Sequence, residues 1–147
     1  RVFVAGHSAG GYLTSMIGLD KRWLEPYGID PDTAFVALIP YSGQVVTHFE
    51  RRRELGLPDT QPLVDDMAPL SYVRPDCRPM LILSGDRERE MLGRYEENAY
   101  FWRMMRVAGH PDVRICEFDG FDHGNMPQAG HFVAVRYIRE MERRMDR

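Results

Sequence analysis

The chain has 147 residues, a length that suits one domain, and its 19 basic and 22 acidic side chains give a formal net charge of −3. The mixed charge offers no basic surface for nucleic acid or for an anionic membrane. No apolar run approaches the roughly 20 residues that cross a bilayer, so neither nucleic acid nor a membrane is an expected partner.

Apolar runs alternate with helix-like segments along the chain. Residues 2–5 form a continuous apolar run, which is typical of a strand covered on both faces of a parallel sheet. From residue 9 to about 19 the apolar spacing becomes helical. The later elements are strands at 33–39, 79–83 and 113–118, and helices at 95–107 and about 128–145. This order predicts an α/β fold, with a mostly parallel sheet and flanking helices.

Residues 44 to about 75 interrupt this alternation. They contain the charged run 50–54 and the prolines Pro58, Pro62 and Pro69. Long irregular connections in compact domains are usually lids, binding loops or disordered segments. We therefore expect a cap-like insert at this position.

Residues 6–10 read Gly-His-Ser-Ala-Gly and match the pattern G-x-S-x-G. The pattern lies between a predicted strand and a predicted helix, where a sharp turn exposes the serine hydroxyl above the sheet. Ser8 is therefore the predicted nucleophile. The backbone N–H of Ala9, at the start of the helix, is the predicted oxyanion-hole donor.

A serine hydroxyl needs a general base, and His123 is the predicted one. It follows the predicted strand 113–118 directly, and a histidine late in the chain fits the order serine, acid, histidine. His7 lies inside the serine turn, and we expect it to shape the turn rather than to transfer protons.

These segments resemble the α/β-hydrolase carboxylesterases. The resemblance rests on Gly-His-Ser-Ala-Gly-Gly at 6–11, Gly-Asp-Arg-Glu at 85–88 and Asp-His-Gly at 122–124. The nearest branch is the acetylxylan and feruloyl esterase-like group, close to the hormone-sensitive-lipase-like and kynurenine-formamidase-like enzymes. The resemblance implies that residues 1–147 form the C-terminal part of a single α/β-hydrolase domain. It also implies that no metal or cofactor is needed.

Two carboxylates in the turn at 85–88 are candidates for the acid that orients the histidine. Asp86 is the commoner residue type for this role. Glu88 lies three residues after the strand-ending Gly85, where relatives of this fold usually place the acid, and this position favours Glu88. Asp122, beside the predicted base, is a weaker third candidate.

Enzymes of this kind carry a His-Gly-Gly-type loop and further strands upstream, and neither occurs in the sequence. We therefore expect that the chain is a fragment lacking the N-terminal half of its own domain. Alone, it should be inactive and should tend to associate through an open strand edge.

The predicted activity is hydrolysis of carboxylic esters of short acyl groups through an acyl-enzyme. The resemblance implies a small-molecule or carbohydrate-linked ester, such as an acetyl or feruloyl ester of polysaccharide, and allows a periplasmic or secreted location. Two alternatives stay open: a prolyl-oligopeptidase-type serine peptidase, and a catalytically idle α/β-hydrolase scaffold. The side chains of the insert that we expect near the substrate are His48, Phe49, Met67 and Tyr72.

Overall fold

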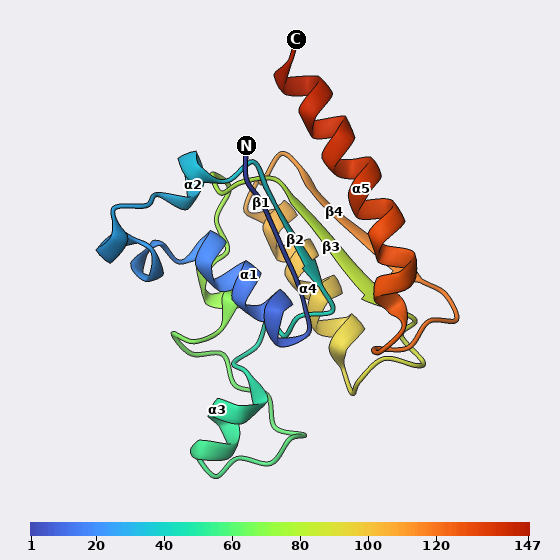
Figure 1. Ribbon diagram of the computed structural model, residues 1–147. Coiled ribbons are helices and arrows are strands. Elements are labelled where there is room, and N and C mark those ends of the chain that lie inside the picture. Colours follow the sequence, from blue (N-terminus) through green and yellow to red (C-terminus); the bar gives the residue numbers. More distant parts are fainter.

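The computed structural model describes residues 1–147 and contains one sheet of four parallel strands in the order β1-β2-β3-β4 (Figure 1). The predicted α/β class and the mostly parallel sheet are confirmed. Because all the strands run the same way, the loops after them meet at one edge, where α/β proteins bind ligands. The strands are β1 (Phe3–His7), β2 (Ala37–Tyr41), β3 (Met80–Gly85) and β4 (Val113–Phe118).

Helices cover both faces of the sheet. Helices α1 (Ala9–Leu19) and α4 (Arg94–Val107) contribute to the core on one face, and α5 (Met126–Met145) packs on the other (Figure 1). The central strands β2 and β3 are buried throughout and feed both cores, because successive side chains of a strand point to opposite faces. On the α5 side the buried helix residues recur at helical spacing, and they are Gly130, Ala134, Tyr137 and Met141.

The strand bounds differ most from the sequence prediction at β2. β2 begins at Ala37 rather than at residue 33, because Pro31–Ala34 forms the short helix α2, whose first turn is capped by the Asp30 carboxylate. β1 is an edge strand of this sheet and its residues are half-buried or exposed. Phe3 packs against the core on the α5 side and Val4 packs against the core on the other side, so both faces of β1 are partly covered.

The insert lies at the carboxyl end of the strands and carries the helix α3 (Phe49–Glu54), which projects from the body of the molecule (Figure 1). Arg52 orders this segment, because its buried guanidinium donates to the carbonyls of Thr47, Asp59 and Gln61. Tyr12 of α1 donates to the carbonyl of Met67 at 2.6 Å and ties the insert to the nucleophile helix.

Three short 3-10 helices complete the chain: η1 (Lys21–Trp23), η2 (Glu25–Tyr27) and η3 (Pro69–Tyr72). The first two follow α1, and η3 closes the insert before β3. None of the helices combines the length and the apolar character that a membrane crossing requires.

Candidate active site

Ser8 forms the turn between β1 and α1, with φ 59° and ψ −115°, a backbone conformation that is strained for any residue but glycine. Two backbone hydrogen bonds hold it there. Its N–H donates to the carbonyl of Tyr41 at 2.9 Å, and its carbonyl accepts from the N–H of Tyr12 at 3.0 Å. A Cβ atom on Gly6 would lie 2.4 Å from the carbonyl carbon of Gly10, so the tight turn requires glycine at position 6.

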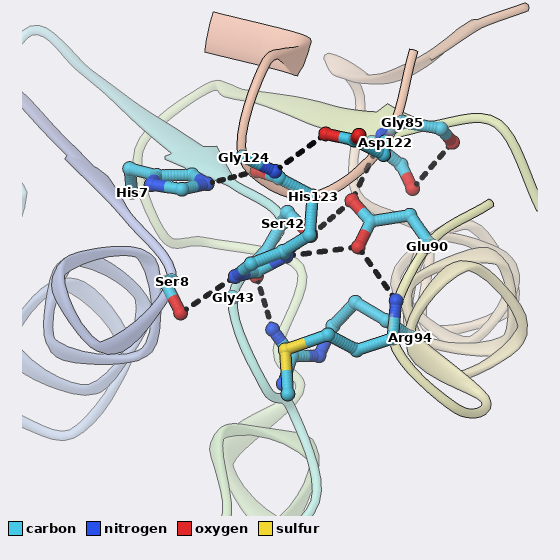
Figure 2. Close-up of polar contacts among 12 residues, drawn as sticks. His7, Ser8, Ser42, Gly43, Gly85, Glu90, Arg94, Asp122, His123 and Gly124 are labelled. Carbon is cyan, nitrogen blue, oxygen red and sulfur yellow. Dashed lines mark hydrogen bonds and ion pairs between the residues drawn. The ribbon is translucent and has the colours of Figure 1, made fainter. Parts of the chain in front are cut away.

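The loop after β4 brings His123 to Ser8, with His123 Nε2 at 2.9 Å from Ser8 Oγ (Figure 2). The loop is fixed on both sides of the imidazole. Asp122 Oδ1 accepts from the N–H groups of Gly124 and Asn125 at 2.9 Å each. His7 Nε2 donates to the carbonyl of His123 at 2.8 Å, so His7 holds the histidine loop, which the sequence did not reveal.

The carboxylate at the other nitrogen of this imidazole belongs to Glu90. Its Oε2 lies 2.8 Å from His123 Nδ1, and the side chain is 0% exposed. Burial raises the pKa of Glu90, but hydrogen bonds from His123, Ser42 and the backbone outweigh burial and lower the pKa to about 2. Glu90 is therefore ionised at neutral pH, ready to accept the Nδ1–H.

The prediction that Glu88 or Asp86 contacts the imidazole is wrong. After β3 the chain makes a helical turn in which Glu90 N–H donates to the carbonyl of Asp86 at 2.8 Å. This turn directs Glu90 back towards His123 and leaves Glu88, two residues earlier, exposed to solvent. The Asp86 carboxylate instead accepts from the N–H groups of Glu88 and Gly120, at 2.8 Å each. Asp122 also makes no contact with the imidazole, because its carboxylate is used within its own loop.

Ser42 is a further member of this hydrogen-bonded group. It follows β2 with φ 45° and is fully buried. Its hydroxyl donates to Glu90 Oε1 and lies 3.0 Å from His123 Nδ1. Arg94 Nη1 donates to the Ser42 carbonyl at 2.5 Å. The only sequence signal for Ser42 is the Ser-Gly pair that ends a predicted strand.

The four insert residues expected near a substrate are dispersed. His48 stacks on Phe49, with ring centroids 4.4 Å apart, and lies 5.3 Å from the ring of Tyr12 on α1. Met67 lines an apolar groove beside Tyr12, on the outer side of α1. The Tyr72 hydroxyl donates to the carbonyl of Asp66 at 2.6 Å and contacts Arg22 of η1. The side chain therefore stabilises the folded insert and its contact with η1.

Ala9 is the first residue of α1, so its N–H has no acceptor within the helix. It lies beside Ser8 at the positive end of the helix dipole, where negative charge is stabilised. No group of three histidine, cysteine, aspartate or glutamate side chains is placed to bind a metal ion.

The loops after β1, β3 and β4 thus place a hydroxyl, an imidazole and an ionised carboxylate in series (Figure 2). A base within hydrogen-bond reach of a hydroxyl, itself oriented by a third group, is the geometry that activates a serine.

Solved structures of an esterase from Thermogutta terrifontis are similar to the chain. Esterase 2 phosphoramylated by tabun gives a TM-score of 0.72 at 22% sequence identity, and the propionate-bound esterase gives 0.70 at 20%. The chain has an α/β-hydrolase fold. These matches cover 96% of this chain and 55–56% of the esterase chains, so the chain spans about half their length. No protein-family model and no curated protein sequence matches the chain.

Proposed function

We propose that the protein is a serine hydrolase that cleaves carboxylic esters, with Ser8 as nucleophile, His123 as general base and Glu90 as the orienting acid. The observation that carries the proposal is the series of two contacts, 2.9 Å from Ser8 Oγ to His123 Nε2 and 2.8 Å from His123 Nδ1 to Glu90. The fold adds support, because the similar Thermogutta esterase is described as phosphorylated by paraoxon and as bound to propionate.

In the first step His123 Nε2 takes the hydroxyl proton while Ser8 Oγ attacks the ester carbonyl. Glu90 accepts the Nδ1–H, which fixes the tautomer with a free Nε2 and stabilises the imidazolium that forms. The negative charge that develops on the carbonyl oxygen is stabilised by the N–H of Ala9 and the N-terminus of α1.

In the second step the imidazolium gives its proton to the departing alcohol and an acyl-enzyme remains on Ser8. A water molecule then attacks the acyl carbonyl, and His123 again takes the proton. The acid is released and the serine is restored, so the chemistry needs only groups of the protein and water.

We propose further that the preferred acyl groups are short. The exposed face of α3 is charged rather than apolar, unlike a surface that docks on lipid. The similar esterase has been solved with propionate and with butyrate. Acetyl or feruloyl esters of polysaccharide fit the sequence resemblance. A series of 4-nitrophenyl esters tests chain length, and a preference for acyl chains beyond about ten carbons would contradict the proposal.

The test of the whole proposal is labelling of the full-length protein with a fluorophosphonate, followed by mass spectrometry of the modified peptide. We expect the adduct on Ser8, and we expect it to disappear in Ser8→Ala and in His123→Ala. Ser71→Ala is a matched control, since Ser71 donates to the carbonyl of Asp65 and lies outside the series. Labelling that persists in Ser8→Ala, or more than a tenth of the esterase activity in that variant, would sink the proposal.

A further inference from the structure

A pocket of about 220 Å³ lies between the insert and the segment that follows Glu90. Phe49 and Arg53 of α3 form one wall, and Met91, Leu92 and Arg94 form the other. The pocket adjoins the serine–histidine–carboxylate series without containing it. Apolar side chains and guanidinium groups thus face the same small space.

Arg94 has an unusual environment in this wall. Its side chain is 4% exposed. Nη1 donates to the carbonyl of Ser42 at 2.5 Å, and Nε lies 3.0 Å from Glu97 Oε1. The structure gives Nη2 no hydrogen bond within the chain, although Arg94 lines the pocket. This nitrogen is not among the fully buried unpaired atoms of the chain, so it is accessible to an acceptor from outside the chain.

The charges around the pocket are unbalanced. Its walls carry Arg52, Arg53 and Arg94 against one acid, Asp59. Arg53 pairs with Asp59 at 3.2 Å and with Glu50 at 2.8 Å, whereas Arg52 is bonded only to backbone carbonyls. Glu97, which pairs with Arg94 at 3.0 Å, does not line this pocket, and burial raises its pKa despite the nearby guanidinium groups. The side chains that line the pocket therefore carry more positive than negative charge.

The pocket is joined to the reactive groups on two sides. Arg94 binds the carbonyl of Ser42, whose hydroxyl contacts Glu90 and His123, and Figure 2 shows Arg94 extending towards Ser42 on this side of His123. On the other side Phe49 stacks on His48, which lies against Tyr12, one turn after Ser8. Two short chains of contacts therefore connect the pocket with His123 and with the helix that begins after Ser8.

We propose that this pocket binds a carboxylate group of the substrate, so that esters carrying a carboxylate are preferred over neutral esters of the same length. The planar fork of a guanidinium matches the two oxygens of a carboxylate. The apolar side chains Phe49, Met91 and Leu92 would contact the methylene groups between the ester and the carboxylate. This inference rests on the proposed esterase function and specifies its substrate class.

The experiment compares matched esters on the full-length protein. The acyl-side arm uses 4-nitrophenyl monoesters of succinate, glutarate and adipate against the butyrate, pentanoate and hexanoate esters. The alcohol-side arm uses 3-carboxyphenyl butyrate against phenyl butyrate. We expect kcat/KM to be about tenfold or more higher for the charged ester in one arm, the size of one charge-assisted contact. The arm that responds identifies the side of the ester that enters the pocket.

Two arginines of α3 provide a matched pair of variants. Arg51 and Arg53 are both about half-exposed, and each pairs with a glutamate three residues away on the helix, but only Arg53 lines the pocket. Arg53→Gln should lower the ratio of charged to neutral kcat/KM by about threefold or more, since one guanidinium is lost. Arg51→Gln should leave both values unchanged. Arg94→Lys, which keeps the charge but loses the fork, should lower the ratio further.

Equal kcat/KM for charged and neutral esters in both arms would overturn the inference, as would a ratio that Arg53→Gln does not change. If the proposed esterase function itself is wrong, neither the charged nor the neutral esters will be hydrolysed, which distinguishes that outcome from failure of the inference. In that case calorimetry with Ser8→Ala still tests the pocket. Glutarate binding that Arg53→Gln weakens supports it, and glutarate binding no tighter than that of butyrate overturns it.

Discussion

The buried carboxylate of Glu90 accepts four hydrogen bonds, one of them from the imidazole of His123. The first prediction concerns the loss of this carboxylate. Glu90→Gln should lower kcat by about three to four powers of ten, because an amide no longer selects the tautomer with a free Nε2. Glu88→Gln should leave kcat within about twofold, since that side chain points to solvent. Steady-state kinetics of the two variants on one ester decides the assignment. A larger loss in Glu88→Gln would return the role to that residue.

The same carboxylate predicts how stability depends on pH. The pKa of Glu90 falls from an ordinary value of 4.5 to about 2 on folding. Its contribution, on the order of 3 kcal/mol, is therefore present above pH 4.5 and is lost as pH falls towards 2. Denaturant unfolding between pH 7 and pH 2 should show a flatter dependence in Glu90→Gln than in the parent. If the free energy of unfolding changed with pH equally in the two proteins, Glu90 would not be the source of this pH-dependent stability.

At this scale the sequence predicted part of the site. Ser8 could be found from the G-x-S-x-G pattern, and His123 because it is the histidine in the loop after β4. Glu90 lies five residues after Gly85, and a helical turn decides which of three acids in this segment faces His123. Backbone bonds that form only in the folded loop fix that turn. The contacts of Ser42 and Arg94 likewise depend on strands β2 and β3 being side by side.

At the scale of elements, α1 packs against the turn after β2 through glycines. A Cβ on Gly11 would lie 2.8 Å from the carbonyl oxygen of Tyr41 and 2.9 Å from Gly43 Cα, whereas a Cβ on Gly10 meets nothing within 4 Å. Gly11→Ala should therefore destabilise the protein by about 1–3 kcal/mol. Gly10→Ala should be neutral, or stabilising by up to about 1 kcal/mol through helix propensity.

Thermal unfolding of the two full-length variants compares them directly. Equal losses of stability in Gly10→Ala and Gly11→Ala would mean that the α1–β2 contact does not discriminate between the positions. In that case the close contact between α1 and the turn after β2 would not be what positions the turn that contains Ser8.

The sequence predicted most elements because their signals are local. β4 has the predicted bounds, and α1 and α4 agree with the prediction to within about a residue. The start of β2 was wrong because the Asp30 cap and Pro31 favour a helical turn over the β-rich composition that follows. Nothing in residues 44–75 predicted that Arg52 would be buried. Its charge is accommodated by carbonyls brought together only when the insert folds.

At the scale of the whole molecule, the outer edge of β1 is unpaired in this sheet. Ala5 on β1 is exposed, as are the nearby apolar side chains Val2 and Leu13. Residues 1–147 expressed by themselves should therefore associate, because an open strand edge pairs with other chains. Ala5→Lys should reduce the association by placing charge at the edge. Light scattering measures the mass, and a concentration-independent monomer in the unsubstituted chain would refute the prediction.

The positions of Ser8 and His123 also bear on folding kinetics. They follow β1 and β4, the two outermost strands of the sheet, and are separated by 115 positions in the chain. Their contact closes only after every strand between them has paired, and contacts of such high sequence separation form slowly. Chemical reactivity of the serine is therefore a late reporter during refolding. Recovery of serine reactivity will lag behind recovery of helical content, since helices form from neighbouring residues and need no such closure.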